Sequence, residues 1–250
     1  MLNELPLFVS MTFMLICISV LFVFLRLILS PLREDGKSKL AIGLILAVFS
    51  WLGLHSLLSL NGFYTASFDL PPRGFLVLLP PLLVIAVVVI LKWKSLYFER
   101  LSLSTMTHIH VFRLPLELIV LSGLASAGFI PDIMTFYGNN PDIIVGLTAP
   151  IVGYFYFSRK VVSKKVLLWW HIFSLLLLMN ISSLAVLSLP YPFQMFGLEQ
   201  PNIAVLNFPF ILLPALLVSV SYFCHIVSIH KLIVFKNSSI SYQIKGNTMG

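Results

Sequence analysis

Three side chains that could do chemistry lie close together in one strongly apolar stretch of the chain. His110, Arg113 and Glu117 are spaced i, i+3 and i+7, so on an α-helix they share one stripe about 60° wide. An arginine and a glutamate four residues apart can pair directly. Ionised groups near the centre of a bilayer cost about 2.5 to 3.5 kcal/mol each, so they normally face the bundle interior and find partners there. Pro115 lies between the two charges and frees a backbone carbonyl one turn earlier.

This stripe is compatible with a functional site and with a purely structural clamp. Arg113 could bind a small anion, and Glu117 could accept and release a proton. Asn140 and Asp142, at the start of the next apolar stretch, could complete such a pocket. In the structural alternative, the Arg113 and Glu117 pair only locks its helix against the neighbouring helices.

Two further histidines could reach the same region. His225 shares a helix face with Ser221 and Ser228 on the last apolar stretch, and His171 lies near the start of the sixth. If adjacent stretches run antiparallel, His110, His171 and His225 lie at similar depth and could converge. Neutral imidazole ligates metals and haem, but no His-x-x-x-His spacing occurs in the chain. We therefore predict no metal site and no resident cofactor, with haem b as the minority alternative.

Seven apolar stretches must position these groups. Mean hydropathy is +1.01, and 10% of residues are charged, where soluble proteins have about 25%. Each stretch approaches the about 20 residues that a spanning helix needs. We therefore predict an all-α polytopic membrane bundle, with residues 1–236 as one domain and 237–250 as a polar cytoplasmic tail. The predicted spans are residues 5–29, 40–62, 74–92, 107–129, 142–158, 166–189 and 207–232.

Lysine and arginine occur almost entirely in alternate connections. Basic residues near helix ends resist translocation, so these connections are predicted to be cytoplasmic, with the N-terminus outside and the C-terminus inside, in a cell inner (cytoplasmic) membrane. The net charge of +7 then reports orientation, and a nucleic-acid partner is not expected. The basic residues are Arg33, Lys37 and Lys39; Lys94 and Arg100; Arg159, Lys160, Lys164 and Lys165; and Lys236 and Lys245.

The connections leave no room for a soluble domain. None exceeds about 20 residues, and no glycine-rich phosphate loop is present, so any chemistry must take place in or at the membrane. Two outer connections, residues 131–141 and 189–207, combine aromatic residues with prolines and turn formers. We expect both to fold back onto the bundle. Cys17 and Cys224 both fall inside predicted spans, so no disulfide framework is implied.

The second half of the chain, about residues 106–232, resembles a family of uncharacterised small polytopic bacterial inner-membrane proteins. The resemblance implies a shared outer loop and a helix carrying Arg and Glu, and it implies no activity. The matching pieces are Arg113-Leu114-Pro115-Leu116-Glu117; Met134-Thr135-Phe136 with Gly138, Asn140, Asp142 and Ile143; Pro201-Asn202; Phe208-Pro209; and Leu213-Pro214-Ala215 leading to His225.

These observations predict a buried polar pocket that binds a small polar or anionic solute or relays protons, including proton-coupled transport. The predicted pocket consists of Arg113, Glu117, His110, Asn140, Asp142 and His225. Two alternatives stay open, a non-catalytic membrane subunit or assembly factor and a haem b-binding redox subunit. Expected partners are the lipid bilayer, the solute, and a membrane-protein partner or a second copy of the chain. The sequence leaves open whether any reaction is catalysed.

Overall fold

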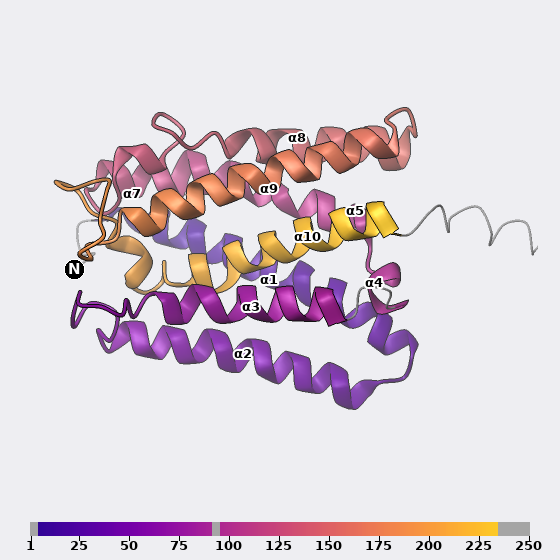
Figure 1. The fold of residues 1–250 in the computed structure, drawn as a ribbon, viewed down its shortest axis with the longest axis horizontal. Helices are drawn as coiled ribbons and strands as arrows, with labels where there is room; N and C mark the ends of the chain where they lie inside the picture. Colours follow the sequence, from indigo (N-terminus) through magenta and orange to yellow (C-terminus); the bar gives the residue numbers. More distant parts are fainter. Residues whose placement is uncertain (1–4, 92–95, 235–250) are drawn as a thin grey trace, which may run out of the picture.

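The computed structural model describes residues 5–91 and 96–234, and this part of the chain is an all-α bundle (Figure 1). Five helical segments are long and apolar enough to cross a membrane, and two apolar helices are shorter. The chain is thus a multi-pass membrane protein. The five are α1 (Leu7–Glu34), α2 (Ser38–Leu60), Leu103–Ser126, α9 (Lys164–Leu187) and Leu213–Val234; the shorter two are α3 (Phe75–Leu91) and Ile143–Ser158.

The predicted count of seven spans therefore stays a prediction. Within the described residues, the two shorter helices extend about 24 to 26 Å at 1.5 Å per residue, less than the hydrocarbon core of about 30 Å. Helix positions agree with the predicted stretches within a few residues, except that the last helix begins at Leu213 rather than at 207. Pro209 and Pro214 cannot donate helical hydrogen bonds, and a single 3₁₀ turn, η5 (Ala204–Leu206), precedes them. The predicted tail, residues 237–250, lies outside the described residues.

The segment that carries Arg113 changes its helical form along its length. It consists of α5 (Leu103–His108), the 3₁₀ turn η1 (Ile109–Phe112), α6 (Arg113–Pro115), the π-helical turn η2 (Leu116–Leu121) and α7 (Ser122–Ser126). Pro115 removes one backbone donor, so a regular α-helical ladder cannot continue across it. The Ser122 hydroxyl instead donates to the Glu117 carbonyl at 2.9 Å. This irregularity changes which side chains share a helix face around Arg113.

The last helix repeats this arrangement. It begins as the π-helical turn η6 (Leu213–Val218), which contains Pro214, and continues as α10 (Ser219–Val234). The Ser219 hydroxyl donates to the Pro214 carbonyl at 3.0 Å, again across five residues. In both segments a serine hydroxyl thus donates to the carbonyl five residues earlier. Pro115 lies directly before the first π-helical turn, and Pro214 lies within the second. Such π-helical turns are frequent at functional sites.

The two ends of the bundle differ in chemistry (Figure 1). The basic end holds the connections at residues 35–37 and 159–163, the short helix α4 (Leu96–Arg100) and the C-terminal end of α10. The loop end holds residues 61–74, 127–142 and 188–212. Side chains at the basic end include Arg33, Lys37, Arg100, Arg159 and Lys164.

The loops at the loop end pack against one another and onto the helices, as predicted. Asn202 is buried, and its backbone N–H donates to the Ser188 carbonyl at 2.8 Å. Gln200 donates from Nε2 to the Ala125 carbonyl at 2.9 Å. The backbone N–H groups of Ile203 and Ala204 both lie 3.1 Å from the Phe129 carbonyl. The connection of residues 189–207 therefore packs onto the ends of α7 and α9.

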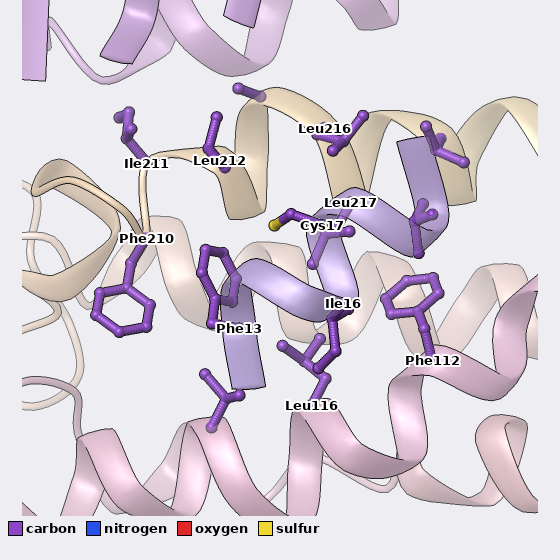
Figure 2. Close-up of a cluster of buried hydrophobic side chains, with 14 of the residues drawn as sticks. Phe13, Ile16, Cys17, Phe112, Leu116, Phe210, Ile211, Leu212, Leu216 and Leu217 are labelled. Atoms are coloured by element: carbon purple, nitrogen blue, oxygen red, sulfur yellow. The ribbon is translucent and has the colours of Figure 1, made fainter. Parts of the chain in front are cut away.

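The core lies between α1, the Arg113 segment and the last helix. In Figure 2, Phe13 and Ile16 of α1 lie between Phe112 and Leu116 on one side and Leu217 on the other. Cys17 is buried there, and it and Cys224 are free thiols, in agreement with the sequence. The Arg113 segment and the last helix are the most enclosed of the candidate spans. His110, Arg113, Glu117 and His225, which lie on these two helices, are all buried.

Candidate functional site

Arg113 and Glu117 are both sequestered from lipid and solvent, as predicted. Each is 1% exposed. The direct pairing expected from their spacing does not occur, because Arg113 NH1 instead forms an ion pair with Asp142 Oδ1. Asp142 immediately precedes α8 (Ile143–Gly153), which continues as the π-helical turn η4 (Tyr154–Ser158). The irregular helix around Pro115 explains why Arg113 and Glu117 do not pair, since side chains at i and i+4 are adjacent only on a regular α-helix.

Asn140 forms hydrogen bonds with the second buried carboxyl group, that of Glu117. Its Nδ2 atom lies 2.9 Å from both Glu117 oxygens and 3.0 Å from the Met134 carbonyl. Its Oδ1 atom accepts from the Asp142 backbone N–H at 3.2 Å. Asn140 therefore connects the Glu117 carboxyl group to the backbone of Asp142 through one side chain, and both predicted loop residues belong to the same cluster as Arg113.

The loop of residues 131–142 reaches these groups because it dips into the bundle. Asn180 of α9 donates from Nδ2 to the Asn139 carbonyl at 2.8 Å. Asn180 lies seven residues before the end of α9 at Leu187, which is about 10 Å along the helix. Gly146 permits the close approach of α8, since a Cβ atom there would lie 2.6 Å from the Leu114 backbone nitrogen.

Three buried histidines converge beside this cluster, an arrangement that the sequence allowed but could not establish. His110 of η1, His171 of α9 and His225 of α10 are each 0% exposed. Each offers a ring nitrogen within 4.8 Å of those of the other two. His171 was not among the predicted pocket residues, although its predicted depth matched that of His110 and His225. The three imidazoles come from three separate helical segments, so only the tertiary fold brings them together.

A directed hydrogen-bond chain runs from Arg113 through two of these histidines. Arg113 NH2 lies 3.5 Å from His225 Nε2, a long contact, and His225 Nδ1 lies 3.1 Å from His171 Nδ1. His171 Nε2 lies 3.2 Å from Thr107 Oγ1, which donates to the Leu103 carbonyl at 2.9 Å. The chain extends toward the basic end, where α5 begins.

The groups at the two ends of this chain fix the tautomers of both histidines, and they require the same direction for the hydrogen bond between them. A guanidinium only donates, so His225 Nε2 accepts from Arg113 and Nδ1 carries the proton of the neutral ring. At the other end, Thr107 spends its one hydroxyl proton on the Leu103 carbonyl, so His171 Nε2 must donate to Thr107. His225 Nδ1–H therefore donates to His171 Nδ1. The tautomer of His225 that Arg113 requires is thus compatible with the tautomer of His171 that Thr107 requires.

His110 lies outside the chain. Its ring stacks on His225 with centroids 3.9 Å apart and an interplanar angle of 4°. Neither of its nitrogens has a hydrogen-bond partner within the described ranges, and the same is true of the hydroxyls of Ser174 and Ser228. These serines lie three residues from His171 and His225 on their helices. Buried polar groups without partners cost about 1 to 3 kcal/mol each, so this side of the triad is suited to water or an ion.

A metal or haem fits the triad less well than protons do. Imidazole ligates zinc, copper and iron in the plane of its ring. The parallel planes of His110 and His225 direct their lone pairs side by side, so a shared metal requires His110 to turn. The stacking distance of 3.9 Å leaves no room for a porphyrin between those two rings. The guanidinium of Arg113 beside His225 also disfavours a cation.

No protein-family model, curated protein or solved structure matches this chain. The resemblance to a family of bacterial inner-membrane proteins therefore stays a prediction.

Proposed function

We propose that this multi-pass membrane protein conducts protons through its buried histidines, with Glu117 as the proton-carrying acid on the loop side. The observation that carries the proposal is the chain from Arg113 through His225, His171 and Thr107, whose tautomers agree from both ends. Proton relays in membrane proteins are commonly built from Asp, Glu and His side chains facing the bundle interior.

Transfer along the chain balances as follows. A proton from Glu117, carried by a water molecule that replaces the long Arg113 contact, is taken up at Nε2 of His225, and the Nδ1 proton of His225 passes to Nδ1 of His171. His171 then releases its Nε2 proton to Thr107 Oγ1, while the Thr107 hydroxyl turns away from the Leu103 carbonyl and passes its own proton to a water molecule on the basic side. No bond to carbon forms or breaks, and no oxidant is needed. Both imidazoles end as the opposite tautomers, so each must turn over before the next proton passes.

The geometry favours proton transfer over anion binding at the same cluster. Arg113 already pairs with Asp142, so an anion would have to displace a buried carboxylate. Arg113 instead positions His225 by donating to Nε2. Under the positive-inside rule, we assign the basic end to the cytoplasm and propose seven spans in a bacterial inner membrane, with the N-terminus outside.

Proton flux in liposomes tests this function. The full chain would be reconstituted with an internal pH-sensitive dye, and a potassium gradient with valinomycin would set the voltage. We expect flux above that of empty liposomes. His171→Gln should lower it at least about tenfold, because a glutamine amide forms hydrogen bonds but does not take up a proton at one atom and release one from another, as imidazole does.

His108→Gln is the matched control. His108 lies on the same segment as Thr107, but its Nδ1 bonds to the Ser104 carbonyl at 2.8 Å and takes no part in the chain. Its flux should equal that of the wild type. Flux no greater than in empty liposomes, or equal flux from His171→Gln and wild type, would contradict the proposal.

Metal binding by the triad is the second candidate, favoured by the unpartnered nitrogens of His110 and by the 4.8 Å span of the donor atoms. His110→Phe separates the two functions, because phenylalanine keeps a ring against His225 and removes a ligand. A proton relay predicts retained flux. A metal site predicts one zinc, copper or iron per purified chain in the wild type and loss of that metal from the variant.

A further inference from the structure

An apolar cavity lies on the side of α10 that faces α2 and α3, away from the His171 site (Figure 1). Its volume is about 1500 Å³, and its walls come mainly from α1, α2, α3, α4 and the last helix, with Leu103, Tyr156 and Lys164 completing them. Pockets for drug-sized molecules measure about 300 to 1,000 Å³, so this cavity is large enough for a lipid. It is distinct from the histidine triad, none of whose residues line it.

The cavity follows the length of a hydrocarbon chain. In Figure 1, α2 and α3 separate toward the basic end, and the cavity occupies the space between them and α1 and α10. Its lining runs along α2 from Lys37 to Leu52, about 22 Å at 1.5 Å per residue. That exceeds half of a hydrocarbon core about 30 Å thick, so an acyl chain fits at full length.

Most of its inner wall is hydrocarbon. Leu44, Val48, Val84, Ile85 and Leu216 line the space along its depth. Left without contents, such walls would lose the dispersion contacts that close packing supplies. An apolar chain restores those contacts without burying any polar group.

The mouth of the cavity is charged. Four basic side chains line the cavity at the basic end against two acidic ones, namely Lys37, Arg100, Lys164 and Lys231 against Asp35 and Glu99. Arg100 is committed to Asp35 by two hydrogen bonds of 2.7 Å, and Lys37 also donates one hydrogen bond to Asp35, at 2.9 Å. Lys231 donates to the Leu101 carbonyl, and an ammonium has three donors, so this bond does not exhaust it. The mouth thus complements a negative headgroup.

We propose that this cavity binds one anionic phospholipid of the surrounding bilayer. An acyl chain lies between α2, α3 and α10, and the phosphate lies near Lys37 and Lys231. Cationic side chains near a membrane surface commonly attract anionic lipids in this way.

Native mass spectrometry of the delipidated full chain tests the site with two probes, dioleoyl-phosphatidylglycerol and dioleoyl-phosphatidylcholine. We expect one tightly bound phosphatidylglycerol per chain and weaker binding of phosphatidylcholine. Val84→Trp should abolish the tight binding by filling the cavity. Leu83→Trp is its control, since Leu83 and Val84 are 63% and 60% exposed but only Val84 lines the cavity.

Removal of charge tests the headgroup. The pair Lys37→Gln and Lys231→Gln should lower phosphatidylglycerol affinity about fivefold for each lysine lost and leave phosphatidylcholine affinity unchanged. The pair Arg33→Gln and Lys39→Gln removes the same charge from the same end outside the cavity lining, and should have a smaller effect. Equal binding of the two lipids, tight binding that survives Val84→Trp, or equal losses from the two pairs would overturn the proposal.

Discussion

The side of the bundle that holds the triad and the side formed by α2 and α3 follow opposite packing rules. In the Arg113 segment and the last helix, 56% of the residues in the most apolar window are buried, against 11% in α2. The first side is joined by one buried ion pair and by hydrogen bonds between helices, and the second borders a cavity of about 1500 Å³. Lipid tails are as apolar as leucine, so apolar surface alone gives helices little reason to associate in a bilayer. Polar groups therefore specify the close packing here.

Among variants that test this difference between the two sides, removal of the Arg113 side chain should lower stability most. Arg113→Met leaves Asp142 buried without its cation, which typically costs about 3 to 5 kcal/mol. Thermal unfolding in detergent measures the loss. Arg100→Met, in the exposed ion pair beside α2, should change the unfolding temperature little, because exposed pairs contribute little.

The double variant Arg113→Met with Asp142→Leu shows whether the pair also functions. If the pair only locks helices, as in a non-catalytic subunit, the double variant should recover part of the stability and all activity. If Arg113 positions His225, stability should return in part while proton flux stays low. Unfolding of the double variant at the same temperature as the single one would contradict a buried pair.

Two glycine substitutions should shift stability in opposite directions. A Cβ atom at Gly146 would lie 2.6 Å from the Leu114 nitrogen, whereas one at Gly53 of α2 would meet no heavy atom within 4 Å. Gly146→Ala should therefore cost about 1 to 3 kcal/mol through overpacking. Gly53→Ala should leave the protein as stable or more stable by up to about 1 kcal/mol. Similar unfolding temperatures for the two variants would show that the two sides pack alike.

The smallest effect is expected from Asp35, at the basic end. Hydrogen bonds from Arg100 and then Lys37 hold the pKa of this carboxyl below its usual range. A lowered pKa stabilises the folded state above the ordinary value of about 3.9, and this stabilisation is lost as pH falls below it. The small difference in unfolding temperature between wild type and Asp35→Asn should thus be full at pH 7 and shrink below about pH 4. A difference that grows in acid would contradict this assignment.

The helix positions could be predicted because apolar length is a local property. The stripe of His110, Arg113 and Glu117 was correctly expected to be sequestered, since buried charge needs partners. Its pairing could not be predicted, because Pro115 and the π-helical turn after it change the helix geometry that the i, i+4 rule assumes. Asn140 and Asp142 could be named as candidates, but not the dip of their loop, which depends on α8 approaching Leu114 at Gly146.

The geometry of the histidine triad also could not be predicted, because its residues lie far apart in the chain. Topology brings His110, His171 and His225 to similar depth, but ring orientation decides between proton transfer and metal binding. Thr107 was missed, although it lies three residues before His110 and therefore on a neighbouring position of the same helix face. The cavity beside α2 has no sequence signal, because its lining residues match those of an ordinary lipid-facing helix.

The dip of residues 131–142 also has an electrical consequence. A polar loop about 10 Å inside the end of α9 shortens the insulating layer that separates the two aqueous compartments. Under the proposed proton function, a transmembrane voltage would fall over a shorter distance, between Asp142 and the basic end, and the histidine chain lies within that interval. One elementary charge crossing 100 mV changes energy by about 2.3 kcal/mol, and a larger share of that energy would then act on the side chains from Arg113 to Thr107.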